Sequence, residues 1–596
     1  MSGWIGHGGT APEATLAAMR PERLAHTVPA CSASGAGFGI AAYGECLVHR
    51  ADDGLIVVLG GHGPAGEGPA LAARVAADYA AGRSCVEGLP GPFALTIVDP
   101  ARHAALIATD RFGMLPIYYC AGPAGLVFAS RLGGVRAHPE VPVHLDPQSI
   151  YDYVFYHCIP SPQTIFRGIA KLRPAEALGW IGGRARQRTY WLPDFVTLPA
   201  ADAAALEREL PERLERAVAR HQGGVPNGAF LSGGLDSSSV AGMLKRVQHE
   251  ADTFTIGFDA QGYDESGYAR LAADHFGTRH HEYFVTPRDV VDMLPVIARF
   301  YDEPFGNSSA IPAYFCARMA KDAGVARMLA GDGGDELFAG NTRYVEQDVF
   351  ERYQHLPEFL RGALETGYAI LPFLKDWSIP GKGWRYIQQA RMGLPDRLQS
   401  YNFLQRMDAA AVFERDWLAH VDRQAPWQAW RHRYGEAASG SALQRMLYLD
   451  WKFTLADNDL VKVNGMCELA GVDVCYPMLD DGVVDFSTRI AEATMLPGRE
   501  LRGFYKRAFG SFLPRAIIDK SKHGFGLPFG VWMREDPGLR EIVRAALDSL
   551  AGRRIFAPAF LEQAVGMHQT GSAAYYGELL WILTVLELWL EGAEIS

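Results

Sequence analysis

The sequence predicts two domains of different class. Residues 1–192 are predicted to form an α+β domain based on an antiparallel sheet, and residues 205–596 an α/β domain with a parallel sheet and a helical C-terminal part. Three observations support this prediction. The chain of 596 residues is too long for one ordinary core. Its first third holds closely spaced apolar runs separated by Gly and Pro, and its middle part alternates apolar runs with amphipathic segments.

The N-terminal domain is predicted from four short runs with the composition of β-strands. They are "LIVVLG" (55–60), "FALTIVD" (93–99), "AALIATD" (104–110) and "PIYYC" (116–120). Their close spacing favours antiparallel pairing, because a parallel pair needs a long crossover between its strands. Residues 190–202, "YWLPDFVTLPAAD", contain two prolines and end in a helix-start signal, so we predict the interdomain linker there.

The second domain begins with a predicted helix over residues 205–222. The runs 228–231, 253–258 and 326–331 predict short buried strands. Val240, Met243, Leu244 and Val247 recur at i, i+3, i+4 and i+7, which is one face of a helix. Residues 311–324 predict another helix. Strands that alternate with helices favour a parallel sheet with right-handed crossovers, and beyond residue 345 the chain is predicted to be mostly helical.

The composition is typical of a folded soluble protein and disfavours several classes of partner. A net charge of −11 without a long Lys/Arg block argues against nucleic acid and anionic membranes. The 8 Cys are scattered without zinc spacing, as expected for isolated thiols in a reducing compartment, and "MSGWIGHGG" is not a signal peptide, so we expect a cytoplasmic location. Residues 579–590 are apolar but too short to span a bilayer, and predict a buried helix.

The stretch "FLSGGLDSSSV", residues 230–240, is the first candidate site. In an open parallel sheet, ligands bind at the carboxyl ends of strands. Two glycines there let a phosphate approach the main chain, and the N–H groups at the start of the following helix face the anion. Asp236 repels phosphate but can bind a magnesium ion that contacts phosphate. No Gly-Lys-Ser/Thr follows, so this is not a Walker A loop; a simple helix N-cap turn is the alternative interpretation.

The stretch "LAGDGGDELFAG", residues 329–340, repeats this pattern of strand, glycine loop, acids and helix start. Asp332, Asp335 and Glu336 lie close together in it. If the two loops follow neighbouring strands, Asp236 and Asp335 can share one cation. The spacing does not match an EF-hand, and a solvated acidic turn is the alternative.

Together the two loops resemble those of the adenylating ligases related to asparagine synthetase. Further segments carry the same resemblance: "GPFALTIVD" (91–99), "DRFGMLPIYY" (110–119), "IPSPQTIFRGIAKLRPAEAL" (159–178) and "KSKHGFGLPFGVW" (520–532). The resemblance implies a glutamine-amidotransferase-like domain with an Ntn-hydrolase-like sandwich fold over residues 1–192. It implies an ATP-pyrophosphatase domain, similar to the adenine nucleotide α-hydrolases, over residues 205–596.

The resemblance also implies roles for individual residues. Asp236 and Asp335 match the magnesium ligands. Asp332 stands where asparagine synthetase has a glutamate near the attacking amine. Lys522 matches a lysine that steadies the phosphates and the developing charge, and Asp473 stands in place of the glutamate of a Glu-x-Arg segment, so these three are the candidate catalytic residues. The positions implied to bind ATP are Leu231, Ser232, Gly233, Gly234, Asp236, Ser237, Ser238, Ile256, Ala330 and Gly331.

These residues suit a two-step ligation. A carboxylate attacks the α-phosphate of ATP and gives an acyl-adenylate, while Mg²⁺ and the first loop stabilise the departing pyrophosphate. A nitrogen nucleophile then displaces AMP. Because the nitrogen must be neutral to attack, a nearby carboxylate can serve as its base, and a cation such as Lys522 can stabilise the tetrahedral intermediate.

The sequence departs from the family pattern at two places. The glutaminase of the family begins with Met-Cys, whereas Ser2 follows Met1 here, and serine is a much weaker nucleophile than a thiolate. Residues 1–192 are therefore interpreted as a structural remnant. Asn464-Gly465 and Asp473-Val-Cys475 replace Asp-Arg and Glu-x-Arg, and the lost arginine removes a bidentate carboxylate clamp. Free aspartate is thus a doubtful substrate, although a packing role for the segment remains an alternative.

The favoured hypothesis is an ATP-dependent, AMP-forming amide ligase that acts on a small-molecule or peptide carboxylate with ammonia or an amine. The alternatives are a glutamine-hydrolysing asparagine synthetase and an intramolecular cyclase of the β-lactam or lasso-peptide type. A non-catalytic nucleotide-binding protein and a tRNA-modifying enzyme are disfavoured by the retained acids, the net charge and the scattered Cys. We also allow for a homodimer.

Overall fold

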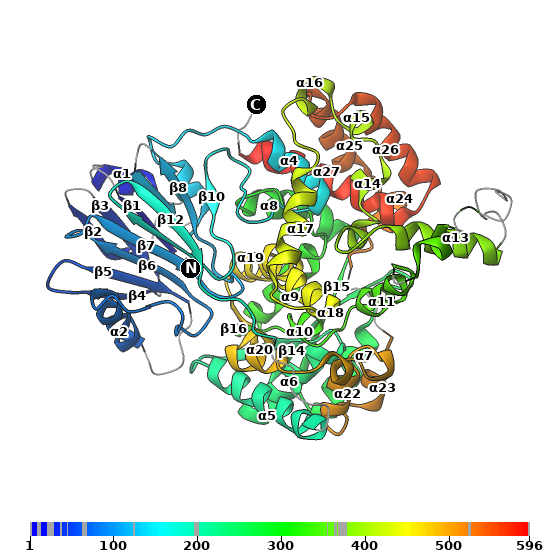
Figure 1. Ribbon diagram of the computed structural model, residues 1–596, viewed down its shortest axis with the longest axis horizontal. Coiled ribbons are helices and arrows are strands. Elements are labelled where there is room, and N and C mark those ends of the chain that lie inside the picture. Colours follow the sequence, from blue (N-terminus) through cyan, green and yellow to red (C-terminus); the bar gives the residue numbers. More distant parts are fainter. Residues whose placement is uncertain are drawn as a thin grey trace.

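The computed structural model shows a sheet-rich N-terminal part packed against a larger, mostly helical part (Figure 1). The structure describes residues 3–593 except 9–12, 21–28, 36–37, 45, 62–67, 123–124, 196–201, 355, 363–365, 367–377 and 522–525. Ser2 and Lys522, two residues that the sequence singles out, lie outside the described residues.

The N-terminal part contains two six-stranded sheets, and every described strand pair in them is antiparallel. The first sheet has the order β10 (Ala170–Lys171), β8 (Tyr118–Gly122), β9 (Gly125–Ala129), β1 (Gly3–Gly8), β3 (Phe38–Tyr43), β2 (Pro29–Gly35). The second has the order β12 (Arg184–Thr189), β11 (Glu176–Ile181), β7 (Ala104–Thr109), β6 (Ala94–Asp99), β5 (Ile56–Gly60), β4 (Cys46–Arg50). The predicted α+β class with antiparallel pairing is confirmed.

The two sheets pack face to face. Side chains such as Trp4, Val58, Ile107 and Phe128 fill the space between them. The outer face of the second sheet is covered by α2 (Gly68–Ala80), which buries Leu71. The outer face of the first sheet joins the large core of the second part, together with α1 (Glu13–Ala18), α3 (Leu132–Arg136) and α4 (Pro147–Tyr156).

The second part is organised around a parallel five-stranded sheet. Its order is β15 (Arg279–Val285), β14 (Asp252–Phe258), β13 (Asn227–Phe230), β16 (Arg327–Leu329), β17 (Asp473–Cys475). After β13 the chain adds β14 and β15 on one side, then returns to place β16 on the other side. The carboxyl ends of β13 and β16 therefore flank a topological switch point, where open parallel sheets bind ligands.

Helices connect these strands and cover the sheet. They are α5 (Ala203–His221), α6 (Leu235–Gln248), α7 (Ser266–Phe276), α8 (Pro287–Phe300), α9 (Ala310–Asp322) and α10 (Gly334–Leu337). The expected helices at 205–222 and 311–324 are thus α5 and α9. On α6 the apolar residues Val240, Met243 and Leu244 are fully buried, as their helical spacing predicts.

The C-terminal part is helical, as predicted. Its longer helices are α11 (Thr342–Gln354), α13 (Ser378–Arg391), α17 (Ala425–Glu436), α18 (Ala442–Asp450), α19 (Leu460–Ala470), α25 (Pro537–Gly552), α26 (Pro558–Thr570) and α27 (Ala573–Gly592). Short helices lie between them: α14 (Phe403–Arg406), α15 (Ala409–Val412), α16 (Arg415–Leu418), α20 (Asp481–Ser487), α21 (Glu492–Met495), α22 (Gly503–Ala508), α23 (Arg515–Ile518) and α24 (Phe529–Glu535). A π-helix, η5 (Trp451–Asp459), and the 3₁₀ turns η4 (Asp396–Gln399), η6 (Pro477–Leu479) and η7 (Pro497–Arg499) complete it.

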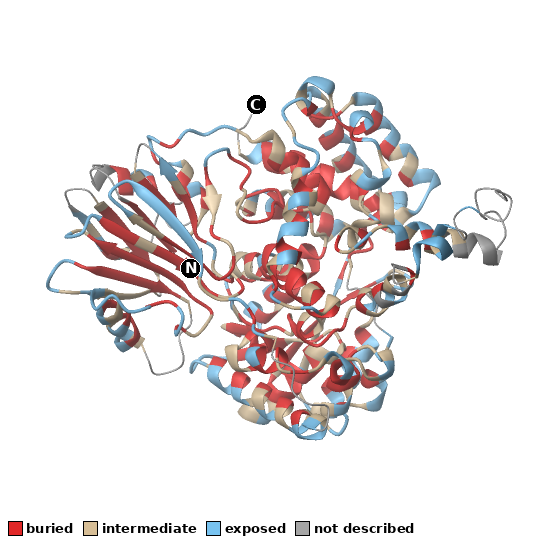
Figure 2. Cartoon of the chain, viewed as in Figure 1, coloured by how far each residue is buried: buried red, intermediate tan, exposed pale blue. Residues whose placement is uncertain are grey.

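Among the described residues, α27 is the one helix long and apolar enough to cross a membrane, and 67% of its most apolar window is buried inside the protein. Figure 2 shows it as part of the buried centre of the helical region. Glu587, which interrupts its apolar sequence, is fully buried and accepts hydrogen bonds from Arg553 Nε and Ser549 Oγ, each at 2.6 Å. The prediction of a buried C-terminal helix is confirmed.

Polar contacts join the two parts. Lys171 Nζ lies 2.8 Å from Glu303 Oε2, and the backbone N–H of Ile165 donates to Glu303 Oε1 at 2.8 Å. Arg111 Nη1 lies 2.6 Å from Asp485 Oδ1 on α20. Because Lys171 and Glu303 are both largely buried, separating the two parts would leave two buried charges without partners.

Candidate active site

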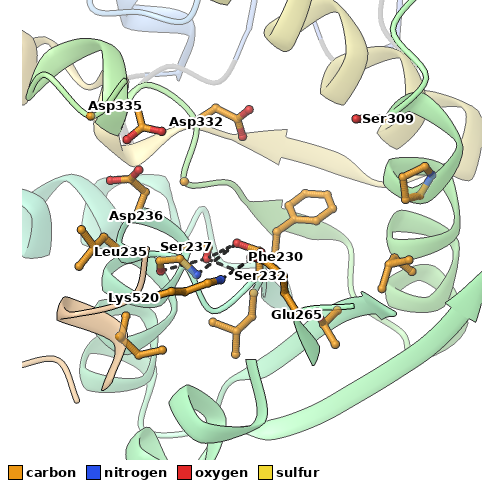
Figure 3. A pocket seen from close by; sticks show the side chains of 18 of the residues that line it. Phe230, Ser232, Leu235, Asp236, Ser237, Glu265, Ser309, Asp332, Asp335 and Lys520 are labelled. Carbon is orange, nitrogen blue, oxygen red and sulfur yellow. Dashed lines mark hydrogen bonds and ion pairs between the residues drawn. The ribbon is translucent and has the colours of Figure 1, made fainter. Parts of the chain in front are cut away.

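A cavity of about 710 Å³ opens at the carboxyl ends of β13, β14 and β16. Its size is within the range of ligand-binding pockets in proteins. It is formed by both loops that the sequence singles out, by α9 and by the segment around α22, and Figure 3 shows it from close by. Of the predicted residues, those that line it are Leu231, Ser232, Gly234, Asp236, Ser237, Ile256, Gly331, Asp332 and Asp335.

The first loop turns sharply between β13 and α6. Gly233 has a φ of +68°, and a Cβ atom there would lie 2.5 Å from Cβ of Tyr268, so both the turn and the close approach require glycine. Ser237 Oγ accepts a hydrogen bond from the N–H of Ser232 at 3.1 Å and lies 3.0 Å from Ser232 Oγ. The serines thus hold the loop in a fixed shape, while the first-turn N–H groups of α6 are available to an anion.

The second loop lies directly against the first turn of α6. A Cβ atom at Gly331 would be 2.7 Å from the backbone nitrogen of Ser237. A Cβ atom at Gly334 would collide with the carboxylate of Asp236, so glycine is needed at both positions. Asp236 and Asp335 consequently point toward one another across the two loops (Figure 3). The sequence predicted this approach of the two carboxylates.

The sequence did not predict the residue that lies between them. Arg502, at the start of α22, donates from Nη1 to Asp236 Oδ2 at 2.5 Å and to Asp335 Oδ1 at 2.9 Å, and from Nη2 to Asp236 Oδ1. It is 4% exposed. Burial lowers the pKa of the guanidinium, but the two carboxylates outweigh burial and raise it overall. Arg502 is 167 residues from Asp335 in sequence, in a segment without a glycine loop or acid pattern.

The two carboxylates are suitable ligands for a magnesium ion, because Mg²⁺ prefers carboxylate oxygens. Their oxygens nevertheless accept hydrogen bonds from Arg502. The donor set therefore fits the ion only if the guanidinium moves away from these atoms.

Asp332 points into the cavity beside these residues (Figure 3). Burial raises its pKa to about 6, and nearby Lys462 partly opposes this. Lys462 Nζ is itself 2.8 Å from Asp459 Oδ1. In the described part of the chain, no cationic side chain forms an ion pair with Asp332, so its carboxylate is available for proton transfer.

Three of the predicted nucleotide-binding residues support the site without lining the cavity. Ala330 is buried, and its N–H donates to the carbonyl of Cys475 at 2.9 Å. Ser238 is fully buried on α6. Gly233 forms the turn, and its carbonyl accepts a hydrogen bond from Lys520 Nζ at 3.5 Å. Lys520 and Lys506 also line the cavity, and neither was predicted from the sequence. Lys520 Nζ lies 3.0 Å from Glu265 Oε2 and Lys506 Nζ lies 3.3 Å from Glu500 Oε1.

The prediction of a catalytic role for Asp473 disagrees with its position. Asp473 is the first residue of β17 and pairs with Arg327, the first residue of β16, so it lies at the end of the sheet away from the cavity. Its side chain is 50% exposed and lies 3.8 Å from Arg327 Nη2. Asp473 was predicted because it stands where the family has a glutamate, but β17 begins at Asp473, and the cavity lies at the carboxyl ends of the strands. We remove Asp473 from the candidate catalytic residues.

The departures Asn464 and Gly465 serve packing. Asn464 Nδ2 donates to the carbonyl of Met114 in the N-terminal part at 2.8 Å, and its Oδ1 accepts from the Tyr476 hydroxyl at 2.8 Å. A Cβ atom at Gly465 would lie 2.5 Å from the ring of Tyr301. The packing interpretation therefore holds for these two positions.

Comparisons with known proteins match both parts of the chain. A family model described as asparagine synthase matches residues 209–591, and one described as a glutamine amidotransferase domain matches residues 75–191. A provisionally assigned glutamine-hydrolysing asparagine synthetase of Mycobacterium bovis is 27% identical over 85% of this chain and 77% of its own length. Glutamine-hydrolysing asparagine synthetase 1 of Bacillus subtilis is 25% identical over 75% of this chain and 69% of its own. A provisionally assigned second asparagine synthetase of Methanocaldococcus jannaschii is 34% identical, over 64% of this chain and 73% of its own.

Proposed function

Because this chain belongs to the asparagine synthase family, whose members are ATP-dependent carbon–nitrogen ligases, we propose that it forms an amide by adenylating a carboxylate and transferring it to an amine. The observation that carries the proposal is the meeting of the two loops at the switch point of the parallel sheet. Asp236 and Asp335 are 99 residues apart in the sequence, and their side chains face one another at the cavity.

The first loop is suited to the pyrophosphate part of ATP. The first-turn N–H groups of α6 and the hydroxyls of Ser232 and Ser237 can donate to phosphate oxygens. Lys506 and Lys520, each paired with a glutamate, line the same cavity and can donate to phosphate if they leave those partners. Asp236 and Asp335 would hold a magnesium ion, which supplies charge neutralisation for the departing pyrophosphate. Leu231 and Ile256, both buried at the cavity wall, can pack against the nucleoside.

Asp332 is the proposed base of the second step. With a pKa of about 6 it is mostly ionised at neutral pH and can take a proton from the attacking amine. The nitrogen then attacks the carbonyl carbon of the acyl-adenylate, the bond from that carbon to the phosphate oxygen breaks, and AMP leaves. Lys522, which lies outside the described residues, keeps its proposed role of stabilising the developing negative charge.

Charges around the second loop support a particular kind of acceptor. Asp332 lines the cavity there, and Lys462, a cation on the same wall, is already neutralised by Asp459 at 2.8 Å. A second carboxylate on the substrate would be repelled by Asp332. This supports a substrate that bears a single carboxylate, rather than free aspartate.

The nitrogen source is proposed to be ammonia or a substrate amine. The glutamine amidotransferase match covers residues 75–191 and does not include Ser2. Glutamine hydrolysis is the second candidate, because the M. bovis and B. subtilis relatives are described as glutamine-hydrolysing and this chain also matches a glutamine amidotransferase domain.

The test is pyrophosphate release from ATP and Mg²⁺ across a panel of carboxylic acids, with ammonia, simple amines or glutamine. We expect release with some acid, at least 100-fold slower in Asp236→Ala, and no stimulation by glutamine beyond that of ammonia. Arg507→Gln, a change on the surface of α22 where Arg507 pairs with Glu207, is the matched control. Full activity of Asp236→Ala would contradict the ligase proposal, and turnover of aspartate with glutamine would favour the second candidate.

A further inference from the structure

The feature that the proposed chemistry does not use is the contact of Arg502 with both candidate metal ligands. We propose that Arg502 and a divalent cation are alternative partners of Asp236 and Asp335, and that Arg502 passes to the phosphates when the cation binds, so that metal and nucleotide bind together. This inference rests on the metal assignment of the proposed function and deepens it.

The geometry makes the two partners competitors. Arg502 donates to both oxygens of Asp236 and to Oδ1 of Asp335, so a cation shared by the two carboxylates has to displace Arg502 from Asp236. The contact is also tightly enclosed. A Cβ atom at Gly340 would collide with the Asp335 carboxylate and lie 2.8 Å from Cδ of Arg502, and the guanidinium carbon lies 4.2 Å from the centre of the Tyr505 ring. Gly340 and Tyr505 thus enclose the guanidinium on their side, while the cavity lies on the other.

The charges lead to the same conclusion. Two carboxylates and one guanidinium leave one net negative charge, whereas adding a divalent cation without other anions would leave one net positive charge at a buried site. Arg502 would then face the ion at short range with no counter-ion of its own. The triphosphate of a nucleotide supplies the missing negative charge, and Arg is well suited to bind it through a bidentate contact.

Arg502 has a place to move to. Arg502 and its neighbour Leu501 line the same cavity as Ser232, Ser237 and Lys506 of the phosphate side. The backbone of Arg502 is in the left-handed region, with φ +58° and ψ +23°, which side-chain-bearing residues rarely adopt. Such a conformation persists only where surrounding contacts hold it, and such conformations cluster at ligand clamps and switch regions. A rotation of the Arg502 side chain within the cavity would exchange the two carboxylates for the phosphates of the nucleotide.

The consequence is a thermodynamic coupling. Because each ligand removes an obstacle for the other, the nucleotide raises the affinity for the metal, and the metal raises the affinity for the nucleotide by the same factor. Replacing Arg502 by an uncharged residue removes the competitor, so the metal can bind alone and the coupling factor falls.

The experiment measures Mn²⁺ binding to the full-length protein by electron paramagnetic resonance, with and without a non-hydrolysable ATP analogue. For the unaltered protein we expect Mn²⁺ to bind at least tenfold more tightly with the analogue. For Arg502→Gln we expect Mn²⁺ alone to bind at least tenfold more tightly than to the unaltered protein, and to raise its melting temperature. Arg507→Gln, on the same helix, should behave like the unaltered protein.

Equal affinity of Arg502→Gln and the unaltered protein for Mn²⁺ alone overturns the inference and leaves the metal assignment intact. Failure of every form to bind Mn²⁺, even with the analogue, overturns the metal assignment and the inference together. If Arg502→Gln does not fold, Arg502→Lys serves instead. It keeps the charge but loses the fork that contacts two carboxylates at once, so it should bind Mn²⁺ alone several-fold more tightly, and an unchanged affinity is again contrary to the inference.

Discussion

The contact between the two loops allows a sharp test of how the site is built. In Gly331→Ala, the added Cβ would lie 2.7 Å from the backbone nitrogen of Ser237 and 3.0 Å from its Cα. These are backbone atoms of the first turn of α6 and cannot rotate away. To reach the 3.4 Å at which ordinary contact begins, the loops must separate by about 0.7 Å.

A displacement of this size should weaken binding at the site strongly but lower the stability of the fold only modestly. Overpacking of this kind lowers the free energy of unfolding by about 1–3 kcal/mol. Mg²⁺ tolerates little departure from its preferred oxygen distances, so moving Asp335 away from Asp236 should weaken the metal-dependent binding of nucleotide about tenfold, or about 1.4 kcal/mol.

The assay is calorimetric titration of a non-hydrolysable ATP analogue in the presence of Mg²⁺, together with urea unfolding. Gly435→Ala is the matched control, because it lies in α17 and its added Cβ would meet no atom within 4 Å. We expect the control to bind normally and to be slightly more stable, since alanine favours helix over glycine. Normal nucleotide affinity in Gly331→Ala would refute the argument that loop contact sets the spacing of the two carboxylates.

Three further predictions concern single side chains. Turnover should fall as the pH drops through about 6, where Asp332 becomes protonated. Asp332→Asn should abolish turnover. The same variant should have a higher melting temperature at pH 7.5, because burial disfavours the ionised carboxylate in the folded protein. Lys452 is buried, and burial lowers its pKa to about 7 in the folded protein. Between about pH 7 and 10 the unfolded chain therefore binds the Lys452 proton and the folded protein does not, so the free energy of unfolding rises with pH. Lys452→Met should remove that rise in a series of melting curves recorded at different pH. Asp473→Ala should leave turnover within twofold of normal, measured as pyrophosphate release, and a 100-fold loss would restore Asp473 to the site.

The sequence predicted those parts of the site whose residues all lie within one short segment of the chain. A loop that must turn sharply and approach a phosphate needs glycines, and a metal-phosphate site needs acids and hydroxyls beside them, so both loops indicate their role within about ten residues. The placement of Asp236 opposite Asp335 required one further assumption, that their strands are neighbours. The alternation of strands and helices made that assumption reasonable, and β13 pairs with β16.

The parts that could not be predicted depend on contacts between distant segments. Arg502 meets Asp236 across 266 residues of sequence, and an arginine before a short helix has no pattern that distinguishes it from a surface residue. Asp473 failed for a related reason. The resemblance singled out Asp473 by its position in the sequence, but whether it reaches the cavity depends on β17, a strand of three residues that the sequence did not predict.

The charges of the cavity explain why Asp332, among several nearby acids, is the one suited to take a proton. Asp236 and Asp335 face Arg502, and Asp459 faces Lys462, so each of these three carboxylates is paired with a cationic side chain. Glu336 differs from them, because burial and then Asp335 raise its pKa well above the usual range.

Asp332 falls between these two cases. Burial raises its pKa to about 6, but nearby Lys462 keeps it from rising as far as that of Glu336. It is therefore charged at neutral pH, yet binds a proton more readily than an ion-paired acid does. A base that works near neutral pH needs this balance. If Lys462→Met raises the pH at which turnover falls by one unit or more, this balance is set by Lys462; an unchanged pH profile would show that burial alone sets it.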